Sequence, residues 1–229
     1  MLLENITFGV ELEYSGISRY TANLAVVAAL RELGLYRCHS DSFPFTATMT
    51  DGRVWRSVTD GSVSCGSEVV SPILTMAGND MVLLQNIMRR LVAAGGRWAP
   101  DSGAGLHCHI GMQNWSDKQM LNLLKFMRKY ERVLVSMVGT TERRESMWCR
   151  PMPGAVIDAV EAGKSRTEIA RAQDGRYVGV NCRSLLTHGT VEMRFLEATG
   201  HAGKLRSQIE LMLMVVRCPN PDEANRHGW

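Results

Sequence analysis

The amino-acid sequence predicts an α+β fold with a mostly antiparallel sheet. Strand-like and helix-like segments alternate irregularly along the chain, whereas a doubly wound parallel sheet requires regular alternation. The strand-like segments 45–50 and 53–58 flank Asp51-Gly52, a turn pair that is typical of antiparallel hairpins. A length of 229 residues without an internal repeat predicts a single domain spanning 1–229.

The first third of the chain is predicted from strand alternation and from residues that begin or end an element. Segment 6–14 has the period-two alternation of a strand. Ser18 is suited to cap a helix over 19–33, because its hydroxyl accepts a hydrogen bond from a backbone N–H of the first turn. After the hairpin, a short strand at 68–71 is expected to end at Pro72, which cannot donate to a sheet ladder.

The middle of the chain contains two amphipathic helices and a strand between them. Segment 79–94 has helical apolar spacing and ends at Gly95-Gly96, where a C-cap is expected. A strand is expected at 106–111, and Ser116 then begins a long helix. The apolar face of the first helix carries Met81, Leu84, Ile87, Met88 and Leu91, and that of the second carries Met120, Leu123, Leu124, Met127 and Leu134.

The last third of the chain has fewer landmarks. Segment 138–171 is expected to be helical but rich in loops, since it contains Pro151 and Pro153. The elements expected after it are strands at 177–181 and 190–195 and a closing helix over 204–217.

Composition and charge argue against several classes of protein. The 26 basic and 23 acidic residues are interspersed and give a net charge of +3, which does not indicate a dedicated nucleic-acid-binding protein. The longest apolar stretch, 22–30, is far shorter than the roughly 20 residues that span a membrane. No secretory signal is recognisable, and the six cysteines form no CxxC pair. We therefore expect a cytoplasmic protein with reduced thiols, bound neither to membranes nor to nucleic acids.

Three strand-like segments share a pattern in which one face is apolar and the other is charged. Side chains two residues apart on a strand lie on the same face of the sheet. In segment 8–14, Val10, Leu12 and Tyr14 alternate with two glutamates. Segment 106–110 repeats the pattern with two histidines, and segment 190–195 repeats it with a glutamate and an arginine. If the strands share one sheet, its polar face carries Glu11, Glu13, His107, His109, Glu192 and Arg194.

A face of this composition is expected to bind metal ions. An ordinary exposed sheet face is also polar, but it would carry Thr, Lys, Gln and Ser as well. Crowded carboxylates repel each other unless cations neutralise them. Mg²⁺ and Mn²⁺ prefer oxygen ligands, and imidazole is compatible with Mn²⁺. Glu68, in an otherwise apolar strand, is either a fourth acidic element of this face or an edge-strand charge that discourages aggregation.

Five short motifs occur in a fixed order along the chain. They are Phe8-Gly-Val-Glu-Leu-Glu13, Asp60-Gly-Ser62, Ser67-Glu-Val-Val-Ser-Pro72, Gly105-Leu-His-Cys-His-Ile110 and Thr190-Val-Glu-Met-Arg194. From Phe8 to about Arg206, the chain resembles the amidoligase family of carboxylate–amine ligases. The resemblance implies the catalytic fold of glutamine synthetase and glutamate–cysteine ligase, a curved, mostly antiparallel sheet with helices packed on one face. The concave face of such a sheet binds ATP and two or three divalent cations.

The resemblance also implies metal ligands on the polar face. Glu11, Glu13 and Glu68 would bind a cation near the acceptor substrate and the phosphate in transfer. His107 and Glu192 would hold the cation that bridges the ATP phosphates. The expected catalytic residues are Glu11, Glu13, Glu192 and Arg194.

Arg194 and three other residues are expected to bind the nucleotide. By the same resemblance, Arg194 binds the phosphoryl group that is transferred. His109 follows the family motif, and Arg144 and Asn181 fall where the family places polar active-site residues. We therefore expect all four side chains to contribute to binding ATP.

The implied reaction joins a carboxylate to an amine. A carboxylate is a poor acyl donor, so ATP first converts it to an acyl phosphate, which the amine attacks to give an amide or isopeptide bond. The expected substrates are a small-molecule or peptide carboxylate and an amine donor, with ATP and Mg²⁺ or Mn²⁺ as cofactors. Phosphoryl transfer mainly needs positioned cations and arginines. Gly163-Lys164-Ser165 imitates a P-loop, but Asp158 replaces its first glycine, so another mode of nucleotide binding is expected.

Two other functions are also compatible with the sequence. The His107–His109 pair fits a metal-dependent hydrolase, which would act without ATP. Alternatively, a non-catalytic protein could contact nucleic-acid phosphates through one basic helical face, formed by Lys125, Arg128, Lys129 and Arg132. The solvated face of an amphipathic helix explains the same basic residues. The sequence sets neither the oligomeric state nor the identity of the two substrates.

Overall fold

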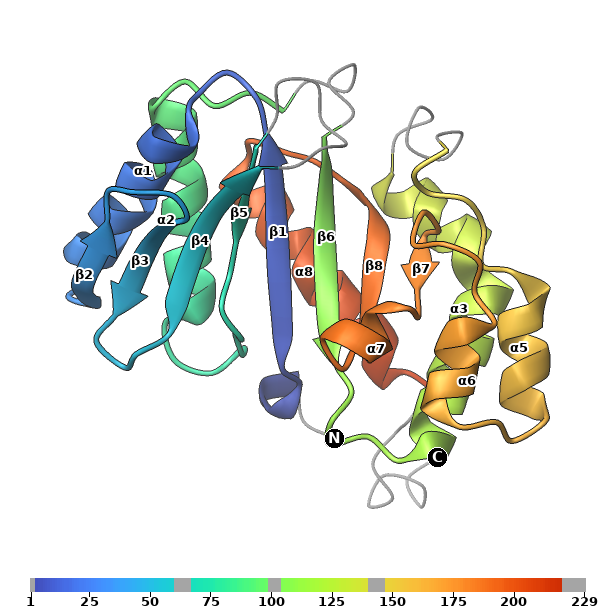
Figure 1. Cartoon of the computed structure of the whole chain (residues 1–229). Coiled ribbons are helices and arrows are strands. Elements are labelled where there is room, and N and C mark those ends of the chain that lie inside the picture. Colours follow the sequence, from blue (N-terminus) through green and yellow to red (C-terminus); the bar gives the residue numbers. More distant parts are fainter. Residues whose placement is uncertain (1–2, 60–66, 99–103, 140–146, 220–229) are drawn as a thin grey trace, which may run out of the picture.

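The computed structural model describes residues 3–59, 67–98, 104–139 and 147–219. Within them, an eight-stranded sheet has the strand order β2-β3-β4-β5-β1-β6-β8-β7. The strands are β1 (Phe8–Tyr14), β2 (Tyr36–Ser40), β3 (Phe45–Met49), β4 (Val54–Thr59), β5 (Ser67–Val70), β6 (Gly105–Gly111), β7 (Val180–Asn181) and β8 (Thr190–Glu197). Neighbouring strands run antiparallel, as the sequence predicts, and β1 lies between β5 and β6 in the middle of the sheet (Figure 1).

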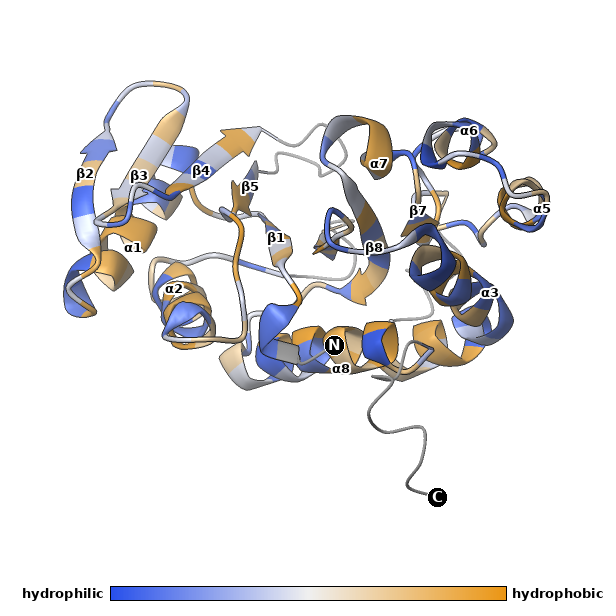
Figure 2. Ribbon diagram, turned by 90° about the horizontal axis from the view of Figure 1, so that it is seen from below, coloured by the Kyte–Doolittle hydropathy of each residue, from blue (hydrophilic) through white to orange (hydrophobic). Residues whose placement is uncertain are grey.

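The helices lie along one face of the sheet and around its β7 end. In the described residues they are η1 (Leu3–Asn5), α1 (Arg19–Glu32), α2 (Asp80–Ala93), α3 (Asp117–Val138), α5 (Gly154–Glu161), α6 (Arg166–Arg171), α7 (Ser184–Thr187) and α8 (Ala202–Arg217). Helices α1, α2 and α8 cover one face, whereas α3, α5 and α6 group beside β7 (Figure 1). The short helix α7 lies on the other side of β8 from α8 (Figure 2). None of the described helices is long and apolar enough to cross a membrane.

Two predicted helix starts are confirmed by hydrogen bonds at their caps. Ser18 Oγ accepts the backbone N–H of Thr21 at 3.0 Å, just before α1. Ser116 Oγ accepts the backbone N–H of Gln119 at 3.2 Å, and the Gln119 side chain accepts the Ser116 N–H at 2.9 Å. Helix α3 therefore begins with a complete capping box, which satisfies backbone donors that have no partner inside the helix.

The core lies between the apolar face of the sheet and the helices that cover it. Val10, Leu12 and Tyr14 of β1 are buried, and so is Cys108 of β6, as the alternation predicts. Burial raises the pKa of the Cys108 thiol to about 12, so this residue packs as a neutral side chain. Hydrophobic residues colour much of α1, α2 and α8 on the same side (Figure 2). The opposite face of the central strands is left for the polar side chains.

Three elements differ from the sequence prediction. The strand expected at 177–181 is limited to β7, since Gly179 donates its N–H to the Arg150 carbonyl instead of extending the ladder. Strand β2 is not predicted, because it is a partly exposed edge strand without apolar alternation. Helix α7 is not predicted either, because its four residues are too few to show a period.

The alternation of β8 also departs from the prediction at one point. The β6–β8 register shifts between Leu106 and Cys108, opposite Arg194 and Phe195 of β8. A bulge of this kind changes the direction of a side chain locally. Glu192 and Arg194 are 4% and 5% exposed, so burial does not separate the two faces of β8, and the hydrogen bond between these side chains identifies the polar face.

Candidate functional site

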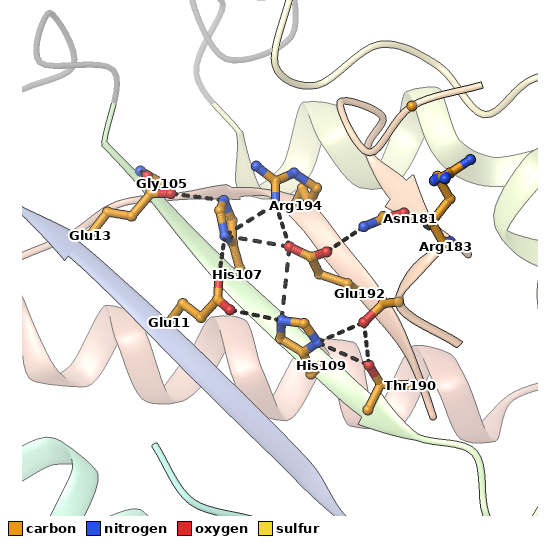
Figure 3. A network of polar contacts seen from close by, with 12 residues as sticks. Glu11, Glu13, Gly105, His107, His109, Asn181, Arg183, Thr190, Glu192 and Arg194 are labelled. Atoms are coloured by element: carbon orange, nitrogen blue, oxygen red, sulfur yellow. Dashed lines mark hydrogen bonds and ion pairs between the residues drawn. The ribbon is translucent and has the colours of Figure 1, made fainter. Parts of the chain in front are cut away.

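The polar face of the central strands brings together residues that are far apart in the sequence. In the β1–β6 register, Glu11 lies opposite His107, and in the β6–β8 register, Glu192 lies opposite His109. Asn181 of β7 lies opposite Glu192 on its other side. Figure 3 shows these side chains pointing toward one another above the sheet. Side chains from four strands thus form one polar cluster on this face of the sheet.

His107 lies at the centre of this cluster and contacts three carboxylates. Its Nδ1 atom is 2.8 Å from Glu11 Oε2 and 3.5 Å from Glu192 Oε1. Its Nε2 atom is 3.2 Å from Glu13 Oε1, and Glu13 also accepts a hydrogen bond from the backbone N–H of Gly105. His107 and Glu13 are only 2% and 1% exposed, so water screens their interaction little.

His109 is held in a fixed orientation by two hydroxyl groups. Its Nδ1 atom lies 2.9 Å from Thr190 Oγ1 and 3.2 Å from Ser184 Oγ. Its Nε2 atom lies on the other side of the ring, 3.3 Å from Glu11 Oε1 and 3.9 Å from Glu192 Oε1 (Figure 3). One ligand atom from each of Glu11, His109 and Glu192 lies within 4.8 Å of the other two. These three side chains form a candidate metal site.

Glu192 is held through both of its oxygens. Arg194 Nη1 donates to Oε1 at 2.5 Å, and Asn181 Nδ2 donates to Oε2 at 2.6 Å. Gln173 Nε2 donates to Asn181 Oδ1 at 2.7 Å, and Gln173 Oε1 accepts the backbone N–H of Cys182 at 2.9 Å. A chain of side chains therefore orients Glu192 from the segment between α6 and β7.

The charges of the cluster compensate one another. Burial raises the pKa of Glu11, but hydrogen bonds from His107 and His109 outweigh this effect and lower it. Burial also raises the pKa of Glu192, and the charges of His107, Arg194 and His109 bring it below its ordinary value. Burial lowers the pKa of His109, yet Glu11 and Glu192 raise it above its ordinary value. The two carboxylates are therefore ionised at neutral pH, which is the state that binds a cation.

The chemistry of the converging donors fits a divalent cation. Glu11 and Glu192 supply carboxylate oxygens and His109 supplies one nitrogen, a set that suits Mg²⁺ or Mn²⁺. The family resemblance groups Glu11 with Glu13 and Glu68 instead. Glu68 lies opposite Glu13 across β1 and β5, on the side of β1 away from β6. Of the described residues, the set that converges therefore spans β1, β6 and β8.

The other residues named from the sequence lie partly inside and partly outside the described structure. Asn181 contacts Glu192, as described above. Arg144 and the motif at 60–62 lie outside the described residues, so their places are still predictions. His107 connects three carboxylates.

Three residues of the site were missed by sequence reasoning. Thr190 lies two residues before Glu192 and therefore on the same face of β8, so alternation along the strand is the signal that would have identified it as a site residue. Ser184 belongs to the four-residue helix α7, and Gln173 lies in the segment after α6. Neither belongs to a periodic pattern, and only the folded chain places them beside the cluster.

A pocket of about 310 Å³ opens beside the candidate metal site. Glu11, His109 and Thr190 line one part of it. The ring of His188, which also lines the pocket, lies 5.7 Å from the ring of His109 and almost perpendicular to it. The His109 end of the cluster is therefore next to a cavity that can hold a ligand.

Two basic residues of α3 have acidic neighbours. Lys125 Nζ lies 3.0 Å from Glu161 Oε1, and Arg128 Nη1 lies 4.0 Å from Glu131 Oε2. These pairs compensate charges that a nucleic-acid surface would need. They favour the solvated face of an amphipathic helix.

Comparisons with known proteins identify a family. No curated protein matches the chain. Among solved structures, the chain is similar to the crystal structure of a bifunctional glutathione synthetase from Pasteurella multocida, with 12% sequence identity and a TM-score of 0.48. That similarity covers 95% of this chain and 40% of that chain, so the chain spans less than half of that protein's length. A family described as "Putative amidoligase enzyme" matches residues 4–216. The chain therefore belongs to the amidoligase family.

Proposed function

We propose that the protein is an ATP- and divalent-metal-dependent carboxylate–amine ligase that forms an amide or isopeptide bond through an acyl phosphate. Membership of the amidoligase family supports the ligase class. The observation that carries the proposal is the convergence of Glu11, His109 and Glu192 beside Arg194 (Figure 3). Phosphoryl transfer depends on positioned cations and arginines, and this cluster offers candidate ligands for a cation beside an arginine. The motifs further support a single domain with the catalytic fold of glutamine synthetase and glutamate–cysteine ligase, and the scattered cysteines support a cytoplasmic location.

Glu11, His109 and Glu192 would hold Mg²⁺ or Mn²⁺. Bound there, the cation would neutralise phosphate charge and the mutual repulsion of the carboxylates. His107 orients Glu11, because its contact with Oε2 leaves Oε1 directed toward His109. Asn181 orients Glu192 in the same way through Oε2. The assignment of a further cation to Glu13 and Glu68 rests on the family motifs.

The chemistry would proceed in two steps. In the first, an oxygen of the substrate carboxylate attacks the γ-phosphorus of ATP, and ADP leaves. In the second, the amine nitrogen attacks the carbonyl carbon of the acyl phosphate, the nitrogen loses a proton, and inorganic phosphate leaves. Arg194, held by Glu192 and lying 3.5 Å from His107, would bind the phosphoryl oxygens in both steps and stabilise their charge.

An assay of ADP release tests the proposal. With MgATP, the protein is expected to release ADP only when both a carboxylate and an amine from a screened panel are present. Glu192→Ala and Arg194→Ala are expected to abolish this release. Arg206→Ala is a matched control, because it removes an arginine from an exposed ion pair with Glu210 on α8. Near wild-type ADP release by either site variant would contradict the assigned roles, and thermal unfolding shows whether each variant is folded.

A metal-dependent hydrolase is the second candidate. Three converging ligands leave coordination positions at which a metal binds water, as in catalytic metal sites. Such an enzyme would give Arg194 no evident task. The same assay separates the two functions, because a hydrolase forms product from a single substrate in the presence of Mn²⁺ and without ATP.

A further inference from the structure

The pocket beside the candidate metal site follows from an irregularity in strand pairing. Glu11 pairs with Val70, but Phe8 pairs with Leu74, so three residues, 71–73, lie opposite only two residues of β1. One extra residue bends a strand segment away from its partner. The hollow left at this point is the pocket of about 310 Å³.

Gly9 keeps the floor of the pocket open. It lies opposite His109 in the β1–β6 register, where any larger residue would project onto the polar face. A Cβ atom at this position would make only ordinary contacts, 3.6 Å from Ser71 Oγ and 3.9 Å from the Pro72 carbonyl. The adjacent wall is apolar, since Pro72 and Ile73 line it, and Ile73 is 64% exposed. The pocket thus offers an accessible apolar surface next to a polar cluster.

Arg56 supplies a positive charge at the β4 side of the pocket. It pairs with Val70 across β4 and β5, and Val70 pairs with Glu11, so the three side chains share the polar face. Within the described ranges, the guanidinium of Arg56 makes no hydrogen bond or ion pair. Nearby Arg53, in contrast, is paired with Asp80 at 2.8 Å. An uncompensated guanidinium over a pocket favours a ligand with an anionic group.

We infer that this pocket binds the ligase substrate that carries a carboxylate in addition to its reacting group, and that Arg56 binds this extra carboxylate. The inference names a substrate class for the proposed function and rests on it. Ligand sites commonly measure about 300–1,000 Å³, so this pocket suits a ligand the size of an amino acid or dipeptide. The apolar wall would contact the carbon skeleton, and the reacting group would lie toward Glu11 and His109. A bare phosphate would gain nothing from the apolar wall.

Equilibrium binding without ATP tests the pocket separately from catalysis. The probes are the twenty amino acids and a set of glycine-containing dipeptides, each as the free acid and as the C-terminal amide. Saturation-transfer NMR in the presence of Mg²⁺ identifies binders, and calorimetry gives their dissociation constants. At least one free acid is expected to bind, and its amide is expected to bind at least about 10-fold more weakly, because the amide removes the charge that Arg56 recognises.

Two variants locate the bound acid. Arg56→Gln is expected to weaken binding of the free acid about 10- to 100-fold and to leave binding of the amide unchanged. Arg37→Gln is the matched control, because it removes an exposed arginine from the edge strand β2. Gly9→Val is expected to weaken binding of acid and amide alike, since its side chain fills the floor. Circular dichroism and thermal unfolding show whether each variant keeps the fold.

Several results would overturn the inference. They are the absence of any binder in the panel, equal binding of acid and amide, and wild-type affinity in Arg56→Gln. Weaker MgATP binding by Arg56→Gln, with unchanged acid binding, would assign the pocket to the nucleotide instead.

The test also separates this inference from the proposed function. If an acid binds through Arg56 but no amine gives ADP release with it, the pocket inference is supported and the proposed ligase function is contradicted. If ADP release is observed and the KM for the acid is the same in Arg56→Gln as in wild type, the ligase function is supported and the role of Arg56 in the pocket is contradicted.

Discussion

Glu131 on α3 and Glu192 on β8 are two buried carboxylates, 5% and 4% exposed, in different surroundings. Burial raises the pKa of Glu131, and the backbone N–H of Met152 and the charge of Arg128, 4.0 Å away, offset this effect only in part. Burial acts on Glu192 in the same direction, yet the charges of His107 and Arg194 bring its pKa below the ordinary value. One positive group at 4.0 Å therefore does not offset the burial of Glu131, whereas the three positive groups around Glu192 outweigh its burial.

The difference separates a structural acid from a candidate ligand. Both oxygens of Glu131 lie 3.0 Å from the N–H of Met152, so this side chain joins α3 to the segment before α5. Both oxygens of Glu192 are oriented by side chains, and one faces the ring of His109 at 3.9 Å. The number of positive groups around the carboxylate, more than its burial, distinguishes Glu192 from Glu131.

The largest expected effect is on catalysis. Glu192→Gln keeps the size of the side chain but removes the charge that faces His109, and is expected to lower ADP release at least about 100-fold. Glu131→Gln makes the same chemical change in a buried position outside the cluster, and is expected to leave ADP release within about 2-fold of wild type. An equal loss of ADP release in the two variants would contradict the special role of Glu192. Thermal unfolding of both variants shows whether such a loss comes from misfolding.

A smaller effect is expected on metal affinity. Ser184→Ala removes one of the two hydroxyls that orient His109, and loss of such a supporting group weakens metal binding by about 10-fold or somewhat more. Titration with Mn²⁺, followed by electron paramagnetic resonance, measures the change. Ser136→Ala on α3, whose hydroxyl donates to the Arg132 carbonyl, is the control. Unchanged Mn²⁺ affinity in Ser184→Ala would show that Thr190 alone suffices.

The smallest effect is on the pH dependence of stability. The pKa of Glu131 is raised in the folded state, so the unfolded chain loses this proton first as the pH rises above about 4.5, and stability falls. Glu131→Gln is expected to remove this fall and to raise the free energy of unfolding at neutral pH by at most about 1 kcal/mol. Urea denaturation between about pH 4 and pH 8 measures it. Glu161→Gln, at an exposed ion pair with Lys125, serves as the control, and a steeper fall in Glu131→Gln would contradict the interpretation.

The sequence predicts the face of each site residue better than it predicts its neighbours. Alternation along the strands places Glu11, His107 and Glu192 on one face, because the direction of a side chain repeats every two residues. Register between distant strands is not contained in alternation, so it does not reveal that Glu11 meets both histidines. The grouping of Glu11 with Glu68 could not be judged from the sequence for the same reason.

The supporting residues could not be predicted at all. Ser184 and Gln173 reach the site from a four-residue helix and from the segment after α6, where no period applies. Arg56 is also invisible as a site residue, because its strand reads as one half of an ordinary hairpin. Its relation to the pocket depends on the extra residue at 71–73, which only the β1–β5 pairing shows.

The position of β1 has a consequence for the order in which the protein is made. Strand β1 is the first described strand, yet it lies in the middle of the sheet, and the last partner of the cluster, β8, lies near residue 190. Contacts between such distant segments form late and slowly. During synthesis, the segments that carry Glu11, Glu13 and His107 emerge before the segment that carries Arg194. Cation binding by Glu11, His109 and Glu192 would therefore require β8 to have joined the sheet.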